Sequence, residues 1–291
     1  MKRSHGPTEE GFYVRLMSPL GRYPSSSFVS ESAALIISSE ICFSIVRVSH
    51  EDFSFSEVDT LKAIEIPLYG SILLSGEPGT PYLFPYPSSD SVALDTESRS
   101  DINEQCIAKC KLFLLDAIQN RSGGYPAIPV HKPPCLGGMK YDLLPWNVKS
   151  DGERLMVLNQ LGIANPVILR GVNCLLKGRM AFQHPELGEA ACIYLWVALD
   201  AAHSLVLKRL RDTGIANPTS KDAARYFEEI SGWETEWERF FEEDYDNRIR
   251  AIHPDNRFGA EAVPQFLADD FLELNDVLIP FFLFFVSEFP K

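Results

Sequence analysis

The sequence predicts an α+β protein, in which a small β-rich N-terminal domain precedes a C-terminal antiparallel helical bundle. The first part of the chain contains short β-branched and aromatic runs separated by Ser, Gly and Pro, a pattern typical of strands. After residue 150, apolar residues recur with helical spacing between capping residues. We therefore expect a β-rich domain with a linker over residues 1–100, a connecting helix and loop over 101–165, and the bundle over 166–291.

Four segments of the N-terminal domain have the composition of strands. They are Phe12–Val14, Ala34–Ile37, Ile41–Val48 and Ile64–Leu74. The following stretch, Ser75–Ser100, is dense in Pro, Gly, Ser and Asp, which predicts a long loop or an inter-domain linker.

Asp101 can cap a helix that runs to about Asn120. Five residues of this helix fall near one stripe: Ile102, Cys106, Leu112, Leu115 and Ile118. The helix connects the two domains and could lie against the bundle. The Pro- and Gly-rich stretch Arg121–Trp146 that follows is predicted to be an irregular surface crossing or lid.

Five helices are expected in the bundle. Their ranges are Pro166–Phe182, Pro185–Thr213, Ser220–Ile230, Glu234–Ile252 and Ala262–Phe289. In the longest of them the predicted apolar stripe consists of Ala190, Tyr194, Val197, Ala201, Leu205 and Leu210. Short connections between consecutive helices favour an antiparallel bundle.

The pentapeptide Gly-Ile-Ala-Asn-Pro occurs twice, at Gly162–Pro166 and at Gly214–Pro218. The sequences that follow the two copies are unrelated, so an internal duplication is not supported. Gly suits the left-handed position that ends one helix, while Asn and Pro suit the start of the next. Both copies are therefore predicted to lie at helix junctions.

The charge balance restricts the partners that the chain can bind. Of 291 residues, 40 are Asp or Glu and 27 are Lys or Arg, a formal net charge of −13. Such a molecule repels nucleic acid except where cations gather locally. The chain contains no G-x-G-x-x-G, phosphate-loop, H-E-x-x-H or G-x-S-x-G sequence, which disfavours ATP hydrolysis and nicotinamide chemistry, and no cofactor is implied.

The sequence favours a cytoplasmic location without a membrane span. No apolar run follows the basic residues near the N-terminus, so no secretory signal is visible. The most apolar stretch, Leu278–Val286, is much shorter than the roughly 20 residues that a span needs, and Pro280 interrupts it, which predicts a buried helix end. The six cysteines lie in mostly apolar contexts, as reduced cytosolic thiols do.

Arg248 and His253 form the sharpest local motif. Because Pro254 disfavours helical geometry at the residue before it, His253 is expected at the end of the fourth bundle helix. A helix C-terminus favours the protonated imidazole. Arg248 lies five positions earlier, roughly 140° around the helix, so both side chains can border one groove. Metal-free phosphodiester cleavage needs a proton carrier and a permanent cation, and this pair supplies both.

The sequence Arg248-x4-His253 resembles the R-x4–6-H motif of HEPN (higher eukaryotes and prokaryotes nucleotide-binding) domains, and the resemblance covers residues 166–289. It implies a helical bundle, a homodimer and metal-independent RNA cleavage or RNA binding, as in prokaryotic defence or toxin–antitoxin systems. By the same resemblance Arg248 would hold the scissile phosphate and His253 would act as general acid or base. Tyr245 and Asn247 would orient the pair. The residue after the Arg, usually polar in active members, is Ile249 here.

An interaction module that binds a protein partner without catalysis is the alternative. Near the motif the cations are Arg248, Arg250 and Arg257. Seven acidic residues make the helix that carries the motif strongly acidic: Glu234, Glu236, Glu238, Glu242, Glu243, Asp244 and Asp246. Acidic surroundings weaken RNA binding and could equally hold a basic protein.

Two further groups of residues have side chains that could take part in chemistry. Cys106, Cys110, His131 and Cys135 provide four soft ligands in two pairs, as a zinc site requires, but a C-x2-C knuckle is absent. We favour the interpretation that the first two are core residues on one helix face. His203 is expected to be a hydrogen-bonded interior or interface residue that could face the same groove as His253.

Overall fold

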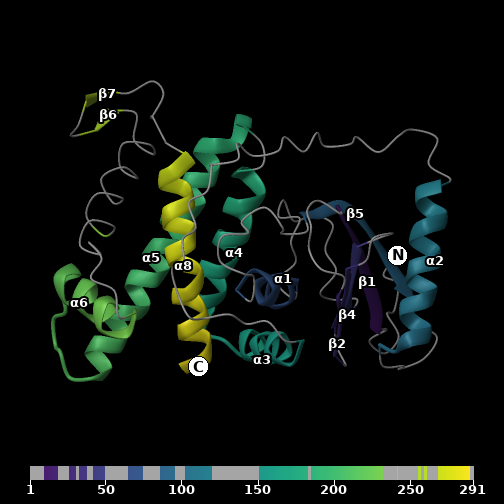
Figure 1. Cartoon of the computed structure of the whole chain (residues 1–291), viewed down its shortest axis with the longest axis horizontal. Coiled ribbons are helices and arrows are strands. Elements are labelled where there is room, and N and C mark those ends of the chain that lie inside the picture. Colours follow the sequence, from purple (N-terminus) through teal and green to yellow (C-terminus); the bar gives the residue numbers. More distant parts are fainter. Residues whose placement is uncertain are drawn as a thin grey trace, which may run out of the picture. The chain divides into compact units, whose positions relative to one another are not determined.

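The computed structural model describes residues 10–18, 26–30, 33–37, 42–49, 65–74, 86–95, 102–119, 151–182, 185–231, 241, 255–256, 259–260 and 268–288 (Figure 1). These residues are mostly helical, with an antiparallel sheet near the N-terminus, so the α+β class is confirmed. The chain divides into two compact units. The first consists of Met1–Tyr69, Tyr82–Val130 and Ser150–Leu155, and the second of Gly70–Pro81, His131–Lys149 and Met156–Lys291.

The first unit is built on a five-stranded antiparallel sheet with the order β2-β3-β4-β1-β5. The strands are β1 (Glu10–Ser18), β2 (Ser26–Val29), β3 (Ala33–Ile37), β4 (Cys42–Ser49) and β5 (Tyr86–Asp95). β1, β3 and β4 coincide with three of the four segments that were predicted to be strands from their composition. β1 pairs on both sides, and a bulge interrupts its register with β5 between Arg15 and Met17.

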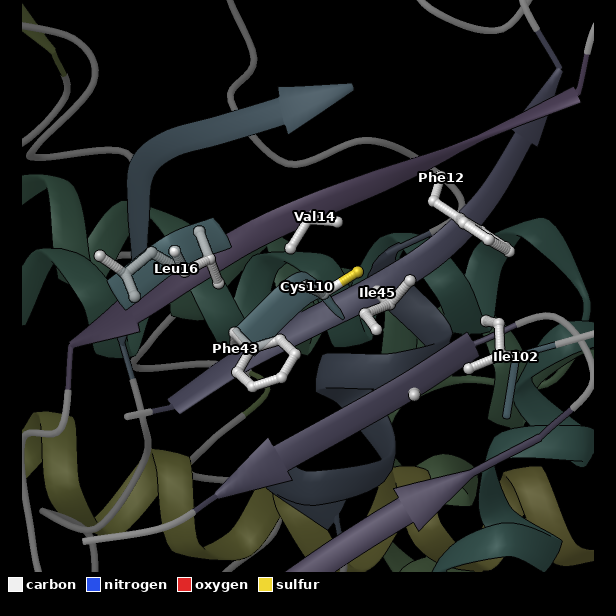
Figure 2. Close-up of a cluster of buried hydrophobic side chains, with 9 residues drawn as sticks. Phe12, Val14, Leu16, Phe43, Ile45, Ile102 and Cys110 are labelled. Carbon is white, nitrogen blue, oxygen red and sulfur yellow. The ribbon is translucent and has the colours of Figure 1, made fainter. Parts of the chain in front are cut away.

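Alternate residues of β1 face opposite sides of the sheet. Figure 2 shows Phe12, Val14 and Leu16 on the same face as Phe43 and Ile45 of the neighbouring β4. Helix α2 (Glu104–Gln119) covers this face, and its buried residues in the cluster include Cys110 and Leu114. The helix expected over Asp101–Asn120 is therefore confirmed, and it packs on the sheet. Its predicted stripe is wrong in part, because Leu112 is 68% exposed.

The segment Ile64–Leu74, predicted to be a strand, is a helix, α1 (Glu65–Leu74). Every residue from Leu68 to Leu74 is buried, and a segment that is apolar on all sides has no periodicity that separates a buried helix from a buried strand. Pro67 lies in the first turn, where its missing N–H interrupts no helical hydrogen bond.

The prediction of a loop or linker over Ser75–Ser100 is wrong for β5. This strand pairs with β1 at the edge of the sheet, with Val14 opposite Val92. Polar residues and Pro87 are compatible with an edge strand, because only one side of its backbone joins the ladder. The pairing partner, rather than the composition of the segment, makes it a strand.

The second unit contains most of the helices. They are α4 (Pro166–Phe182), a 3₁₀ turn η2 (Pro185–Leu187), α5 (Gly188–Asp212), α6 (Ser220–Ser231) and α8 (Ala268–Glu288), together with α3 (Asp151–Gly162) from Met156 onward. The helices expected from Pro166, Pro185, Ser220 and Ala262 are thus confirmed over their described residues. The helix expected over Glu234–Ile252 lies outside the described residues except for Phe241, which is helical and buried.

Helices α4, α5 and α8 lie side by side (Figure 1). Gly178 of α4 approaches α5 closely, so that a Cβ at this position would lie 3.3 Å from the carbonyl oxygen of Ala191. A Cβ on Gly171 would overlap the ring of Phe282 in α8. The apolar stretch Leu278–Val286 forms the buried C-terminal half of α8, as expected, although Pro280 lies inside the helix.

Both copies of the pentapeptide lie at helix junctions, but they end the preceding helices differently. Gly214 has φ +104°, the left-handed conformation expected after a helix, whereas Gly162 is the last residue of α3 and its φ is not positive. Asn165 caps α4, since its Oδ1 accepts the N–H of Val167 at 2.8 Å. At the second junction the capping residue is Thr219.

The buried face of α5 is wider than the predicted apolar stripe and is rotated about the helix axis relative to it. Ala191, Leu195 and Ala198 are buried, whereas Ala190 and Tyr194 of the predicted stripe are partly exposed. α5 contacts α4, α6 and α8, so much of its circumference is covered. Among the described helices, α5 alone is long and apolar enough to span a membrane, and 56% of its most apolar window is buried, as in a core helix.

Candidate functional site

The residues of the predicted motif lie outside the part of the chain that the structure describes. They are Tyr245, Asn247, Arg248, Arg250, His253 and Arg257. The residues that flank the motif are described: Asp255–Asn256 (β6) pairs with Gly259–Ala260 (β7) in a two-stranded antiparallel sheet, and Phe241 lies seven positions before Arg248.

Phe241 connects the motif segment to the bundle. Its side chain is buried, and its ring centroid lies 4.7 Å from that of His203 in α5 and 5.5 Å from that of Phe227 in α6. Phe227 in turn contacts Phe281 of α8 with centroids 4.4 Å apart. An aromatic cluster therefore attaches Phe241 to three helices of the second unit.

His203 lies where α5 meets the start of α6. Its Nε2 is 3.4 Å from the hydroxyl oxygen of Ser220, the first residue of α6. Both side chains are half-buried. Burial lowers the pKa of His203, because the charged imidazole loses hydration, so the neutral form prevails at pH 7. The expectation of a hydrogen-bonded interior histidine agrees with this geometry.

The first turn of α6 is fixed by reciprocal hydrogen bonds. The backbone N–H and the hydroxyl of Thr219 both donate to Oδ2 of Asp222 at 2.8 Å, and the N–H of Asp222 donates to Oγ1 of Thr219 at 3.3 Å. The backbone hydrogen bond and the hydroxyl of Thr219 lower the pKa of Asp222. The start of α6, and with it the position of Ser220, is thereby determined.

A second polar group lies between α4 and α8. Nε of Arg179 donates to Oδ1 of Asn275 at 3.0 Å, and Nδ2 of Asn275 donates to Oδ1 of Asp276 at 3.0 Å. Burial raises the pKa of Asp276, although Arg179 opposes the shift. The Asp276 carboxylate is 4.0 Å from the guanidinium, so the amide of Asn275 is its closer partner.

The first unit contains a buried polar network on the face of the sheet opposite α2. Arg15 of β1 forms a bidentate ion pair with Glu65 of α1, through Nε to Oε1 at 2.7 Å and Nη2 to Oε2 at 2.9 Å. Arg15 also donates a hydrogen bond to the hydroxyl of Tyr13. The hydroxyl of Tyr69 donates to the carboxylate of Glu65 and shares a second hydrogen bond with the hydroxyl of Ser44. Arg15 and Glu65 are 1% and 0% exposed, so this network is a structural core rather than an accessible site.

Burial opposes the charge on Arg15, but its hydrogen bonds and attraction to Glu65 prevail and raise the pKa of Arg15. Burial also raises the pKa of Tyr69 well above its usual value. The sequence does not predict this network, because the segment Ile64–Leu74 that contains Glu65 and Tyr69 is expected to be a strand. The spacing of Glu65 and Tyr69, one helical turn apart in an apolar segment, was the available signal.

The cysteines of the possible zinc set are core residues where the structure describes them. Cys110 is buried under the sheet, and burial raises its pKa to about 12. Burial also raises the pKa of Cys106, which packs against the same cluster. His131 and Cys135 lie outside the described residues, and among the described residues no three His, Cys, Asp or Glu side chains are grouped as metal ligands.

No family model, curated protein or solved structure matches this chain.

Proposed function

We propose that the C-terminal part of the chain is a HEPN-like, metal-independent endoribonuclease that works as a homodimer. The single observation that carries the proposal is the sequence Arg248-x4-His253, followed by Pro254, between the helices α6 and α8 of a bundle. Prokaryotic defence or toxin–antitoxin function in the cytoplasm is part of the same proposal.

The chemistry follows from the two side chains. Arg248 neutralises the phosphate on which charge develops, and His253 transfers the proton. In a reaction without a metal-bound water, the nucleophile is the 2′-hydroxyl of the RNA itself. RNA is therefore a substrate and DNA of the same sequence is not. Tyr245 and Asn247 orient the pair, while Arg250 and Arg257 add local attraction for phosphates in an otherwise acidic chain.

The experiment is cleavage of a labelled single-stranded RNA in EDTA by the full chain. His253→Ala and Arg248→Ala should each abolish cleavage, and His184→Ala, outside the motif, should leave it unchanged. A matched RNA with one 2′-deoxy nucleotide at the cleaved position should resist. Undiminished cleavage by His253→Ala would contradict the assignment of His253 as the general acid or base.

The acidic residues that precede the motif favour a second function, in which the chain binds a basic protein without catalysis. Seven Asp and Glu residues lie between Glu234 and Asp246. This function predicts no cleavage of RNA and a stable complex with a basic partner that high salt dissociates. Neutralising four of the seven acids should weaken that complex, whereas it should strengthen RNA binding if the chain is a ribonuclease.

A further inference from the structure

Helix α2 carries two exposed apolar side chains on the side that faces away from the sheet. Its inner side packs on the sheet through Cys110 and Leu114 (Figure 1). On the outer side Leu112 is 68% exposed and Phe113 is 41% exposed. Among the described residues of the first unit, no large apolar side chain is more exposed than Leu112. Two adjacent apolar side chains on one rigid helix are a candidate contact surface.

Opposite charges flank this apolar pair along the helix. Lys109 and Asp116 are both exposed and lie seven positions apart, so they project from the same side of the helix axis. Leu112 and Phe113 come midway between them. At 100° per residue, the four side chains fall within about 100° of the helix circumference. These four residues, called the outer face of α2 below, therefore run in the order cation, two apolar side chains, anion.

This order of charges is complementary to itself when two copies of α2 run antiparallel. A twofold axis between Leu112 and Phe113 sets Leu112 of one copy opposite the partner's Phe113. The same axis sets Lys109 opposite the partner's Asp116, and the pair recurs at the other end of the contact. A parallel arrangement would instead set lysine opposite lysine and aspartate opposite aspartate, which repels. A second copy of the chain therefore fits this face in one direction and one register.

We propose that the outer face of α2 is a docking surface for α2 of a second copy of this chain, in an antiparallel pair. Leu112 and Phe113 contribute by removing apolar surface from water, and the two Lys109–Asp116 pairs set the direction and the register. The contact lies in the first unit. It does not rest on the proposed ribonuclease or on the homodimer of its C-terminal bundle.

The size of the face makes this contact a weak one. Four side chains from each copy are far fewer than the roughly 20–30 residues that each partner of a standard interface contributes. The pair is therefore expected at protein concentrations of about 100 µM, and it should exchange rapidly with separate copies. A weak contact of this kind requires a measurement that reports the outer face itself.

The first test is carbodiimide cross-linking, which joins an amine directly to a carboxylate, in an equal mixture of nitrogen-15-labelled and unlabelled full chains. Peptide mass spectrometry should find Lys109 joined to Asp116, with one residue from a labelled chain and the other from an unlabelled chain. Within one helix the two residues are separated by a rise of roughly 10 Å, so a direct link between copies is favoured. The mixed label proves that the link joins two copies.

The second test is charge reversal, followed by sedimentation of the full chain. Lys109→Glu and Asp116→Lys each set like charges opposite one another and should weaken self-association by about tenfold. Mixed in equal amounts, the two variants should associate as the wild type does, because a cation then lies opposite an anion at both ends. The average mass of the mixture should therefore exceed that of either variant alone. The control is Glu104→Lys, exposed and about 140° around the helix from Lys109, which should sediment as the wild type does.

Two further variants separate this contact from folding and from the ribonuclease. Leu112→Glu should lower the yield of the cross-link at least tenfold and leave thermal unfolding unchanged, because the side chain is exposed. His253→Ala should form the cross-link as the wild type does, so failure of RNA cleavage and failure of pairing are distinguishable. Three results would overturn the proposal: no link of mixed label, a link of Lys109 only to acids of its own chain, or a mixture of charge variants no heavier than its components.

Discussion

Replacement of Glu65 by Gln should be among the most destabilising single changes in the first unit. The change keeps the size of the side chain and removes only the charge that pairs with Arg15. The guanidinium of Arg15 is 1% exposed and makes two hydrogen bonds to the carboxylate, at 2.7 and 2.9 Å. In the variant the cation stays buried beside a neutral amide whose NH2 group points at another donor.

The expected loss follows from the cost of an uncompensated buried charge. Breaking a buried pair by removing one partner costs about 3–5 kcal/mol, a large fraction of the roughly 5–15 kcal/mol by which domains are stable. At an m-value of about 2 kcal/mol/M, the urea midpoint should fall by about 1.5–2.5 M. Replacing both partners, as Arg15→Met with Glu65→Leu, should restore most of this loss because no charge remains buried.

Urea unfolding should be followed by alkylation of single cysteines, read by mass spectrometry. Cys110 is buried in the core of the first unit, whereas Cys174 and Cys192 are buried in the helical unit. In the Glu65→Gln variant the midpoint reported by Cys110 should fall. The matched control is Glu104→Gln on the exposed first turn of α2, which should cost about 0.5 kcal/mol.

Two results would refute this reasoning. A loss below about 1 kcal/mol in the Glu65→Gln variant would mean that water reaches the pair, because an exposed ion pair contributes no more than that. A double variant that is no more stable than Glu65→Gln would mean that packing around the network, rather than the buried charge, determines the loss.

Three further predictions concern the helical unit. Gly171→Ala should lower the free energy of unfolding in urea by about 1–3 kcal/mol, because the new Cβ would overlap the ring of Phe282. The control is Gly162→Ala, whose Cβ has no atom within 4 Å and which should be neutral or stabilising. Equal effects of the two substitutions would contradict the packing argument. Burial raises the pKa of Asp276, so the folded state favours the protonated carboxyl. The stability that the protonated Asp276 contributes is present below the ordinary carboxyl pKa and is lost as the pH rises through the raised pKa. Asp276→Asn, which removes the buried charge, should therefore raise the Tm at pH 7. Hydrogen bonds from Thr219 lower the pKa of Asp222, so the stability that its carboxylate contributes is present above the ordinary carboxyl pKa and is lost on acidification. Asp222→Asn should therefore lower the Tm at pH 7. If the two Asp→Asn variants change the Tm in the same direction, the argument is refuted.

The sequence predicts those helices and strands whose secondary structure follows from their own residues rather than from distant partners. The helix that begins at Pro166 is predicted from Asn165, a good capping residue, and Asn165 does cap it. The helix that begins at Ser220 is also predicted, although Thr219 rather than Asn217 of the pentapeptide caps it. β1, β3 and β4 were found from their β-branched runs. In these elements local preference and tertiary contacts favour the same structure.

The elements that were missed depend on distant partners. The sequence predicts a strand at α1 because a fully buried segment carries no amphipathic period. It predicts a linker at β5 because β1 supplies the backbone partner that the polar sequence of β5 does not imply. For the same reason the contacts of Arg15 with Glu65, and of His203 with Ser220, could not be predicted, since each joins residues from separate elements. His203 was recognised as a hydrogen-bonded histidine, but its partner was not.

The most direct test of the ribonuclease proposal is the initial rate at which the wild type and His253→Ala cut one labelled RNA in EDTA, at equal concentrations of folded protein. The proposal predicts metal-independent cleavage by the wild type and a rate lower by about 10²–10⁴-fold in the variant, because the proton carrier is lost. A wild type that leaves the RNA intact, or a variant that cuts it equally fast, would contradict the assignment of Arg248 and His253 to RNA cleavage.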